Sequence, residues 1–195
     1  MKVLDGIQPK LARWLLEQPM FVVATAPMAA GGHVNVSPKG MAGTFAVLDQ
    51  YRVGYLDYFG SGAETIAHLR ENGRITLMFT AFSGRPTVVR LYGRGRVVLV
   101  DDPEFAELRG IFSKARTVGQ RSIILVEVDR VQESCGYAVP LMEFVADREV
   151  LDLHQLKKGP QEYEGRGHLK NPASIDGLPA LAAPADSEQP TPAAP

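Results

Sequence analysis

Short apolar runs separated by turn residues fill the first two thirds of the chain. Residues 21–26 are apolar and rich in β-branched side chains, and residues 33–36 alternate polar with apolar positions after a pair of glycines. This pattern predicts a β-hairpin. Residues 45–48 and 51–58 show the same arrangement and predict a second hairpin.

Three further strands are predicted at residues 75–82, 87–100 and 122–131. The middle one is long for a single strand, and it contains Gly93 and Gly95. Glycine inside a strand often marks a bulge or a bend, which a sheet needs where it curls into a barrel. We therefore expect this strand to bend near its two glycines.

Two helices have clear end signals. Residues 9–18 begin at a proline and place apolar side chains at positions i, i+3 and i+4, which is typical of an amphipathic helix. Residues 61–72 begin with Ser61 and Glu64, the spacing of a capping box, and Gly73 follows the last turn. These signals predict a helix that starts at Ser61 and ends at Gly73.

Residues 102–112 and 145–156 are predicted as two more helices, the second with Leu151 and Leu153 near the core. The elements together are six or seven mostly antiparallel strands and three or four helices. This combination indicates a mainly β fold, a small β-barrel with helical decoration.

The composition is that of one soluble globular domain followed by a tail. The chain has 195 residues, of which 45% are hydrophobic and 22% charged, enough for one sizeable core. Residues 178–195 contain five of the 14 prolines and no aromatic residue. We expect a domain over residues 1–177 and a flexible tail over residues 178–195.

Charge and cysteine content exclude several classes of protein. With 21 basic and 22 acidic side chains the net charge is -1, so no overall field attracts nucleic acid or an anionic membrane. No signal peptide or membrane span is visible. The single cysteine, Cys135, cannot form an intramolecular disulfide and fits a reducing cytoplasm.

Cysteine and histidine give no sign of a metal site or of a nucleophile. Cys135 has no partner at a revealing spacing, and we expect a buried, inert thiol. His68 lies on a predicted helix, and His154 and His168 are isolated. No pair of histidines has the spacing of metal ligands, so we predict no bound metal.

The segment from Tyr55 to Gly62 is the most informative local feature. A strand runs through a glycine-rich turn into a capped helix, where free backbone N–H groups, the helix dipole and the Ser61 hydroxyl would suit a phosphate. The alternative is that Ser61 caps the helix and does nothing else. The segment is neither a dinucleotide-binding glycine motif nor a Walker loop, because the required third glycine and the Gly-Lys-Ser/Thr are missing.

Two other strands carry an excess of polar side chains. His33, Asn35 and Ser37 alternate on one side of a strand that ends at Lys39, which is either a binding surface or a solvated strand face. Further along, a second strand places a row of side chains on one face, namely Arg90, Tyr92, Arg94 and Arg96. Ion pairs with acidic residues are the expected explanation for Arg94 and Arg96.

At these residues the chain resembles the pyridoxamine 5′-phosphate oxidase-like flavoproteins, the FMN-binding split-barrel superfamily, and especially its predicted flavin-nucleotide-binding branch. The resemblance covers most of residues 19–179 and is specific only when its motifs are taken together. The motifs lie at Asn35–Gly40, Tyr55–Thr65, Glu71–Phe79, Arg90–Gly95 and Asn171–Pro179.

The resemblance implies a homodimer of six-stranded antiparallel split barrels with two FMN molecules at the subunit interface. It further implies that the strand ending at Lys39 lies along the flavin and its phosphate, and that residues 55–58 meet the edge of the flavin ring. The cofactor-binding residues implied in this way are Asn35, Ser37, Lys39, Tyr55, Asp57, Ser61, Gly62, Thr65 and Arg90.

This chain departs from the family pattern at two places. The oxidases hold the phosphate with a serine and an Arg-Lys pair, where this chain has Gly60-Ser61-Gly62. Lys39, the helix N-terminus, Thr65 and Arg90 would have to hold the dianion instead. The arginine motif that binds pyridoxal phosphate is replaced by the proline-rich tail, so oxidation of pyridoxamine phosphate itself is not expected.

The leading hypothesis is therefore an FMN-binding oxidoreductase that acts on an unidentified small molecule, with no catalytic residue assigned. Tyr137, Arg148 and Lys170 lie late in the domain, where split barrels cover the flavin. A flavin carrier or sensor without its own substrate, and a reductase that uses FAD or a deazaflavin, are the alternatives. A nucleic-acid-binding barrel that uses the arginine row is a third, which the near-neutral charge disfavours.

Overall fold

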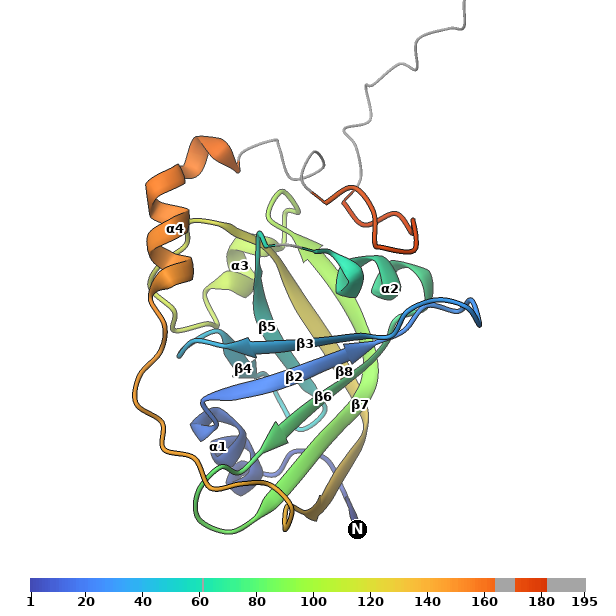
Figure 1. Ribbon diagram of the computed structural model, residues 1–195, viewed down its shortest axis with the longest axis vertical. Coiled ribbons are helices and arrows are strands. Elements are labelled where there is room, and N and C mark those ends of the chain that lie inside the picture. Colours follow the sequence, from blue (N-terminus) through green and yellow to red (C-terminus); the bar gives the residue numbers. More distant parts are fainter. Residues whose placement is uncertain (61, 164–170, 182–195) are drawn as a thin grey trace, which may run out of the picture.

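One curled antiparallel sheet forms the body of the protein (Figure 1). The structure is a computed structural model that describes residues 1–60, 62–163 and 171–181. Within this part the sheet has eight strands. They are β1 (Lys2–Leu4), β2 (Met20–Thr25), β3 (Asn35–Gly40), β4 (Phe45–Val47), β5 (Arg52–Tyr58), β6 (Arg74–Thr80), β7 (Thr87–Leu99) and β8 (Gln120–Cys135).

The strand order is β3-β2-β6-β7-β8-β5-β4, with β1 paired to β8, and every pair is antiparallel. The predicted mainly β fold is confirmed, and both predicted hairpins are present as β2–β3 and β4–β5. Two strands have only three residues each, β1 and β4, so six longer strands make the barrel. The sequence pattern missed β1 because three residues are too few to show alternation.

Helices cover the two open ends and one side of the sheet (Figure 1). They are α1 (Pro9–Glu17), α2 (Glu64–Asn72), α3 (Phe105–Arg109), α4 (Val150–Lys158) and a short 3-10 helix, η1 (Pro160–Glu162). In the described part of the chain no helix is both long and apolar enough to cross a membrane. Their apolar faces pack on a core that includes Leu15, Ile66, Leu77, Leu91 and Ile124.

The start of α2 differs from the sequence prediction. The helix begins at Glu64 after Ala63, which has no side-chain cap, whereas the capping box placed its start at Ser61. Ser61 itself lies outside the described residues. The predicted end is confirmed, because Gly73 follows the helix with a left-handed φ of 71°, a conformation that glycine adopts without strain.

The two later helices are shorter than predicted. Only Phe105–Arg109 of the predicted residues 102–112 are helical, since the carboxylate of Asp102 accepts a hydrogen bond from the Leu99 backbone instead of opening a helix. In α4, which begins five residues after the predicted start, Leu153 is exposed. The buried positions are polar: Asp152 and Gln155.

The C-terminal boundary was predicted too early. Ala180 and Leu181 are buried and Leu178 packs against the same core, so residues 178–181 belong to the folded domain. Apolar side chains here are spaced among prolines, and composition alone therefore hid their burial. The remainder of the predicted tail lies outside the described residues.

A β-bulge bends the longest pair of strands. The register between β7 and β8 shifts between Tyr92 and Gly93, which confirms the predicted bulge or bend. A Cβ atom on Gly93 would collide with the carbonyl oxygen of Glu127 on β8. Only a residue without a side chain allows the two backbones to approach this closely.

Ion pairs among three charged side chains connect β3, the first strand in the order, with β5, the last but one. The carboxylate of Asp57, on β5, accepts hydrogen bonds from Lys39 Nζ at 3.1 Å and from Arg121 Nε at 2.5 Å. Lys39 lies on β3, the opposite end of the strand order, and only 2% of the Asp57 side chain is exposed. The Lys39–Asp57 pair of this triad thus links β3 to β5, which share no backbone ladder, whereas Arg121 lies on β8, the direct neighbour of β5.

The charge of Asp57 depends on its two partners. Burial raises the pKa of the Asp57 carboxyl, but the nearby Lys39 and Arg121 cations outweigh burial and hold the pKa below its ordinary value of 3.8. Asp57 is therefore a carboxylate at neutral pH. A lowered pKa in the folded state means that the ionised form stabilises the fold.

Replacing Gly93 with alanine should destabilise the barrel. The new Cβ would meet a backbone carbonyl that cannot move away, and we expect a loss of about 2 kcal/mol or more in the free energy of unfolding. Urea unfolding measures this loss. Gly31→Ala is the control, since nothing lies within 4 Å of its added Cβ, and equal effects of the two substitutions would contradict the bulge argument.

Replacing Asp57 with asparagine should remove a pH-dependent part of the stability. At about pH 7 we expect a loss of about 3 kcal/mol, because Arg121 keeps its charge in a buried setting without a carboxylate. The Asp57 contribution is complete above the unfolded pKa of 3.8 and disappears as the pH falls through the lower folded-state pKa.

The difference between wild type and Asp57→Asn should therefore shrink as the pH falls below 3.8, as measured by unfolding at a series of pH values. Asp49→Asn is the control, because Asp49 pairs with Arg52 on the surface, where ion pairs contribute little. A gap between wild type and Asp57→Asn that stays constant with pH would refute the assigned ionisation.

Candidate functional site

A long groove of about 1840 Å³ runs across one side of the barrel. Its walls come from the end of α1, from β3, from the last residues of β5, and from the loop and first turn of α2. The segment of residues 136–149 that connects β8 to α4, here called the strap, passes along the other side (Figure 1). Six of the sequence-predicted binding residues line this groove, namely Asn35, Ser37, Lys39, Asp57, Gly62 and Thr65.

Asn35 is the centre of a hydrogen-bond chain at one end of the groove. Its Nδ2 donates to Thr25 Oγ1 and to Thr65 Oγ1, both at 3.0 Å, and its Oδ1 accepts from Ser37 Oγ at 2.8 Å. The β3 register explains the arrangement, because Asn35 and Ser37 pair with the inward positions Thr25 and Val23 of β2. The predicted polar strand face therefore points toward the core side of the sheet and not to solvent.

Tyr55 lies next to the hydrogen-bond chain of Asn35, close to Thr65. It is fully buried on β5, and Lys39 Nζ lies 5.8 Å from the centre of its ring. Burial raises the pKa of the Tyr55 hydroxyl well above its ordinary value, and the charge of Asp57 adds to the effect. The hydroxyl is near Thr65 but has no hydrogen bond of full geometry. Tyr55 is not among the residues that line the groove. It therefore acts here as a buried residue of the core.

Arg121 is a groove residue that the sequence analysis missed. Only 5% of its side chain is exposed, yet it lines the groove, and its Nη1 has no hydrogen-bond partner. A buried N–H without a partner is costly unless something accepts from it. Arg121 opens the apolar strand β8, and a charged side chain inside such a run was the available signal.

His68 lies on the buried face of α2. Its Nδ1 is 2.9 Å from Thr25 Oγ1, which connects it to the Asn35 hydrogen bonds, while its Nε2 has no partner. Burial lowers the pKa of His68, although Glu71, Asp176 and Glu64 oppose the shift. The ring is therefore neutral at pH 7 and acts as a packed hydrogen-bonding residue.

The other half of the groove is apolar. Its floor is a cluster of aromatic rings, in which Phe21 stacks on Phe79 at a centroid distance of 5.2 Å and Phe45 packs against both. The strap is tied down at two points across the mouth: the Met142 N–H donates to Phe82 O, and Asp147 accepts from the Ala42 N–H. Arg148 and Phe144 of the strap line the groove, which places Arg148 where it was expected.

The arginine row makes contacts outside the groove. Arg90 donates to Ser134 Oγ at 3.2 Å and is not among the residues that line the groove. Arg96 forms the expected ion pair, with Glu104, whereas Arg94 donates to the carbonyl oxygen of Asn72. On the β2–β3 loop, His33 pairs with Asp176 at 2.6 Å and is no part of the groove.

Cys135 was predicted to be buried, and this prediction is wrong. It is the last residue of β8 and is exposed, because β8 runs four residues beyond the predicted strand end. Tyr137 follows on the exposed strap, while Lys170 and His168 lie outside the described residues. Among the residues that the structure describes, no three histidine, cysteine or acidic side chains gather as metal ligands.

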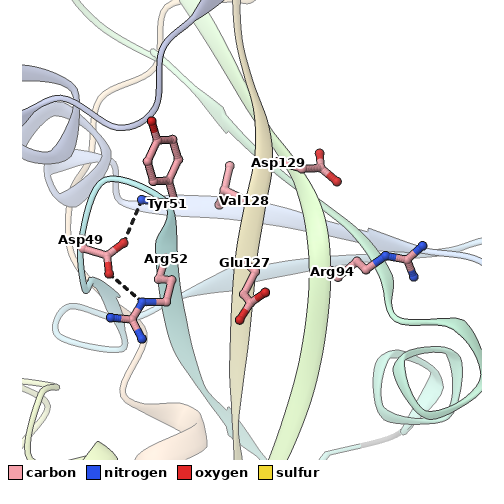
Figure 2. A pocket seen from close by; sticks show the side chains of 7 residues that line it. All are labelled: Asp49, Tyr51, Arg52, Arg94, Glu127, Val128 and Asp129. Carbon is pink, nitrogen blue, oxygen red and sulfur yellow. Dashed lines mark hydrogen bonds and ion pairs between the residues drawn. The ribbon is translucent and has the colours of Figure 1, made fainter.

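A second hollow of about 550 Å³ lies on the outer face of β5, β7 and β8 (Figure 2). Surface charges surround it, and Asp49 accepts hydrogen bonds from the Tyr51 N–H and from Arg52 Nε. The pKa of Asp49 is lowered by the first of these bonds and then by the second. None of the residues predicted to bind a ligand lines this hollow, and its charged groups are open to water.

Comparison with known proteins places the fold and the sequence in one family. The family model of pyridoxamine 5'-phosphate oxidase matches residues 7–135. The chain is 39% identical over 191 residues to the pyridoxamine 5'-phosphate oxidase family protein ustO of Aspergillus flavus, and the match covers 91% of this chain and 76% of the relative.

The solved structure of another protein has a similar fold. HupZ of Group A Streptococcus matches with a TM-score of 0.52 and 18% identity over 64% of this chain and 91% of that one. An FMN-binding protein from Syntrophomonas wolfei subsp. wolfei matches with a TM-score of 0.47 and 14% identity, over 63% and 82% of the two chains. The match of the family model over most of the barrel, together with the identity to ustO, establishes that this chain belongs to the pyridoxamine 5'-phosphate oxidase family and has its split-barrel fold.

Proposed function

We propose that this protein binds FMN in the groove and uses it as an oxidoreductase on a small molecule. The observation that carries the proposal is the polar end of the groove. There the Asn35 hydrogen bonds, the Lys39–Asp57–Arg121 triad and the first turn of α2 converge beside an aromatic floor. A flavin nucleotide needs the same combination, since it joins an apolar ring system to a polar chain and a phosphate.

The residues present fit the phosphate group of such a cofactor. The first N–H groups of α2 have no partners inside the helix, and Gly62 lines the groove just before it. Arg121 Nη1 is buried without an acceptor, which a ligand oxygen in the groove would provide. Lys39 and Thr65 would complete the set. Ser61, which the sequence analysis also assigned to the phosphate, lies outside the described residues.

A bound flavin supplies the transfer of hydride or electrons at its ring. The chain would supply binding and orientation. Asn35 and Ser37 are already fixed by hydrogen bonds to each other, so they offer donors and acceptors in set directions. Lys39 and Arg121 exceed Asp57 by one positive charge, which favours an electron-rich ligand beside them. The strap would limit the entry of water from the open side.

The size of the groove favours an enzyme over a simple carrier. Sites for single small ligands usually have volumes of about 300–1,000 Å³, whereas this groove has about 1840 Å³. A cofactor at the polar end therefore leaves room for a second molecule beside the aromatic floor. We do not assign a catalytic residue, because no group of the chain is fixed relative to that second molecule.

We also infer a homodimer with the flavin near the subunit interface. Val34, directly before β3, and Val36, on the outer side of β3, are 68% and 64% exposed, and Leu141 and Val145 of the strap are exposed as well. Exposed apolar side chains on the end strand of the sheet and on the strap, two segments with other residues that line the groove, favour a protein neighbour over solvent. Light scattering after gel filtration measures the mass of the particle and tests this inference.

Purified protein should bind FMN, and Lys39→Ala should weaken the binding. The substitution removes a cation from the polar end and leaves Asp57 with one partner. We expect about a tenfold or larger increase in the FMN dissociation constant, as measured by quenching of flavin fluorescence. Lys10→Ala, a change on the exposed side of α1, is the control and should bind FMN like the wild type.

Several outcomes of this experiment separate the hypotheses. Absence of binding by the wild type to FMN, FAD or a deazaflavin would refute a flavin site. Preference for FAD or a deazaflavin would change the cofactor and leave the site in place. A flavin-loaded protein that is reduced by no nicotinamide donor and passes electrons to no common acceptor would be a carrier or sensor.

A further inference from the structure

Acidic side chains outnumber cationic ones along the groove, although a site for a phosphate would favour the opposite balance. Among the described residues that line it, four side chains are cationic and five are acidic. The cations are Arg85, Lys39, Arg121 and Arg148, and the acidic residues are Glu17, Asp57, Glu64, Glu143 and Asp147. The triad of Lys39, Asp57 and Arg121 carries one net positive charge, and Glu64, which lines the same groove at the start of α2, offsets it.

Glu64 stands at the position where an anion would bind. It is the first residue of α2, and its side chain folds back over the loop before the helix, where a Cβ atom built on Gly62 would collide with Oε2. The positive end of the helix dipole favours a carboxylate here. The same N-terminal N–H groups are the ones that a ligand phosphate would use.

No other side chain of the described residues holds the Glu64 carboxylate. The described residues make no hydrogen bond and no ion pair with it, in contrast to Asp57, which accepts from both cations of the triad. Arg121, whose side chain is only 5% exposed, lines the same groove, and its Nη1 independently has no acceptor among the described residues. Among the described residues, the groove therefore contains both a carboxylate without a partner and a buried N–H without an acceptor.

We propose that Glu64 is a specificity-determining residue that competes with the phosphate of the ligand for the N-terminus of α2. A dianionic phosphate has to displace the carboxylate or bind beside it, and either event costs free energy through like-charge repulsion. A ligand with the same ring and no phosphate does not meet this cost. This inference rests on the proposed flavin site. A phosphate at this site would lack the Arg-Lys pair that the resemblance leads one to expect, and it would also be repelled by the charge of Glu64.

The test compares FMN with riboflavin, which lacks the phosphate, in wild type and Glu64→Gln. Glutamine keeps the shape of the side chain and removes its charge. We expect the affinity for FMN to rise about tenfold in Glu64→Gln, while the affinity for riboflavin stays within about twofold of wild type. Quenching of flavin fluorescence at low ionic strength gives both dissociation constants, and circular dichroism confirms that each variant is folded.

Glu107→Gln is the matched control, because Glu107 is also an acidic residue in the first turn of a helix, α3, but lies outside the groove. It should leave both affinities unchanged. An equal change for FMN and riboflavin, or no change for FMN, in Glu64→Gln would overturn the role of Glu64 and leave the flavin site intact. If neither flavin binds to any of the three proteins, the proposed function fails and the role of Glu64 fails with it.

Discussion

The buried carboxylate of Asp57 is the constraint on which the barrel and its groove both depend. Backbone ladders connect each strand only to its neighbours, and β3 and β5 are not neighbours. Two cations on different strands meet this one acidic group, and each of the three would be costly to bury alone. The cost is met only when all three strands are in place, so the charges favour the closed barrel over an open sheet.

The same triad determines what the groove contains. It holds Lys39 beside the ring of Tyr55, on the strand whose register with β2 turns Asn35 and Ser37 inward. The Nη1 of Arg121, which takes no part in this pairing, has no acceptor among the described residues. The family supplies the barrel, but the charge of this chain's groove follows from its own residues. A glutamate stands in the first turn of α2, and Gly60 and Gly62 lie in the loop before it.

The sequence predicted most of the barrel because each long strand alternates or forms an apolar run, and because Gly93 marks the bulge. It failed where tertiary contacts override local signals. Capping-box spacing predicted a helix start at Ser61, but Gly62 and Ala63 are not helical and α2 begins at Glu64. The buried side of α4 is polar, so no apolar periodicity could reveal it. Arg121 was missed because its role depends on Asp57, 64 positions away in the chain.

The pairing of the first strand affects how the chain can fold as it is made. Lys2 pairs with Glu133, and Ala180 completes the core that Leu15 and Phe21 begin. The hairpins β2–β3, β4–β5 and β6–β7 join near neighbours and can form early, whereas the pairing of β1 with β8 joins segments far apart in the chain. A nascent barrel therefore leaves apolar surface open until its last core residues emerge from the ribosome, and during that interval it is exposed to aggregation and to chaperones.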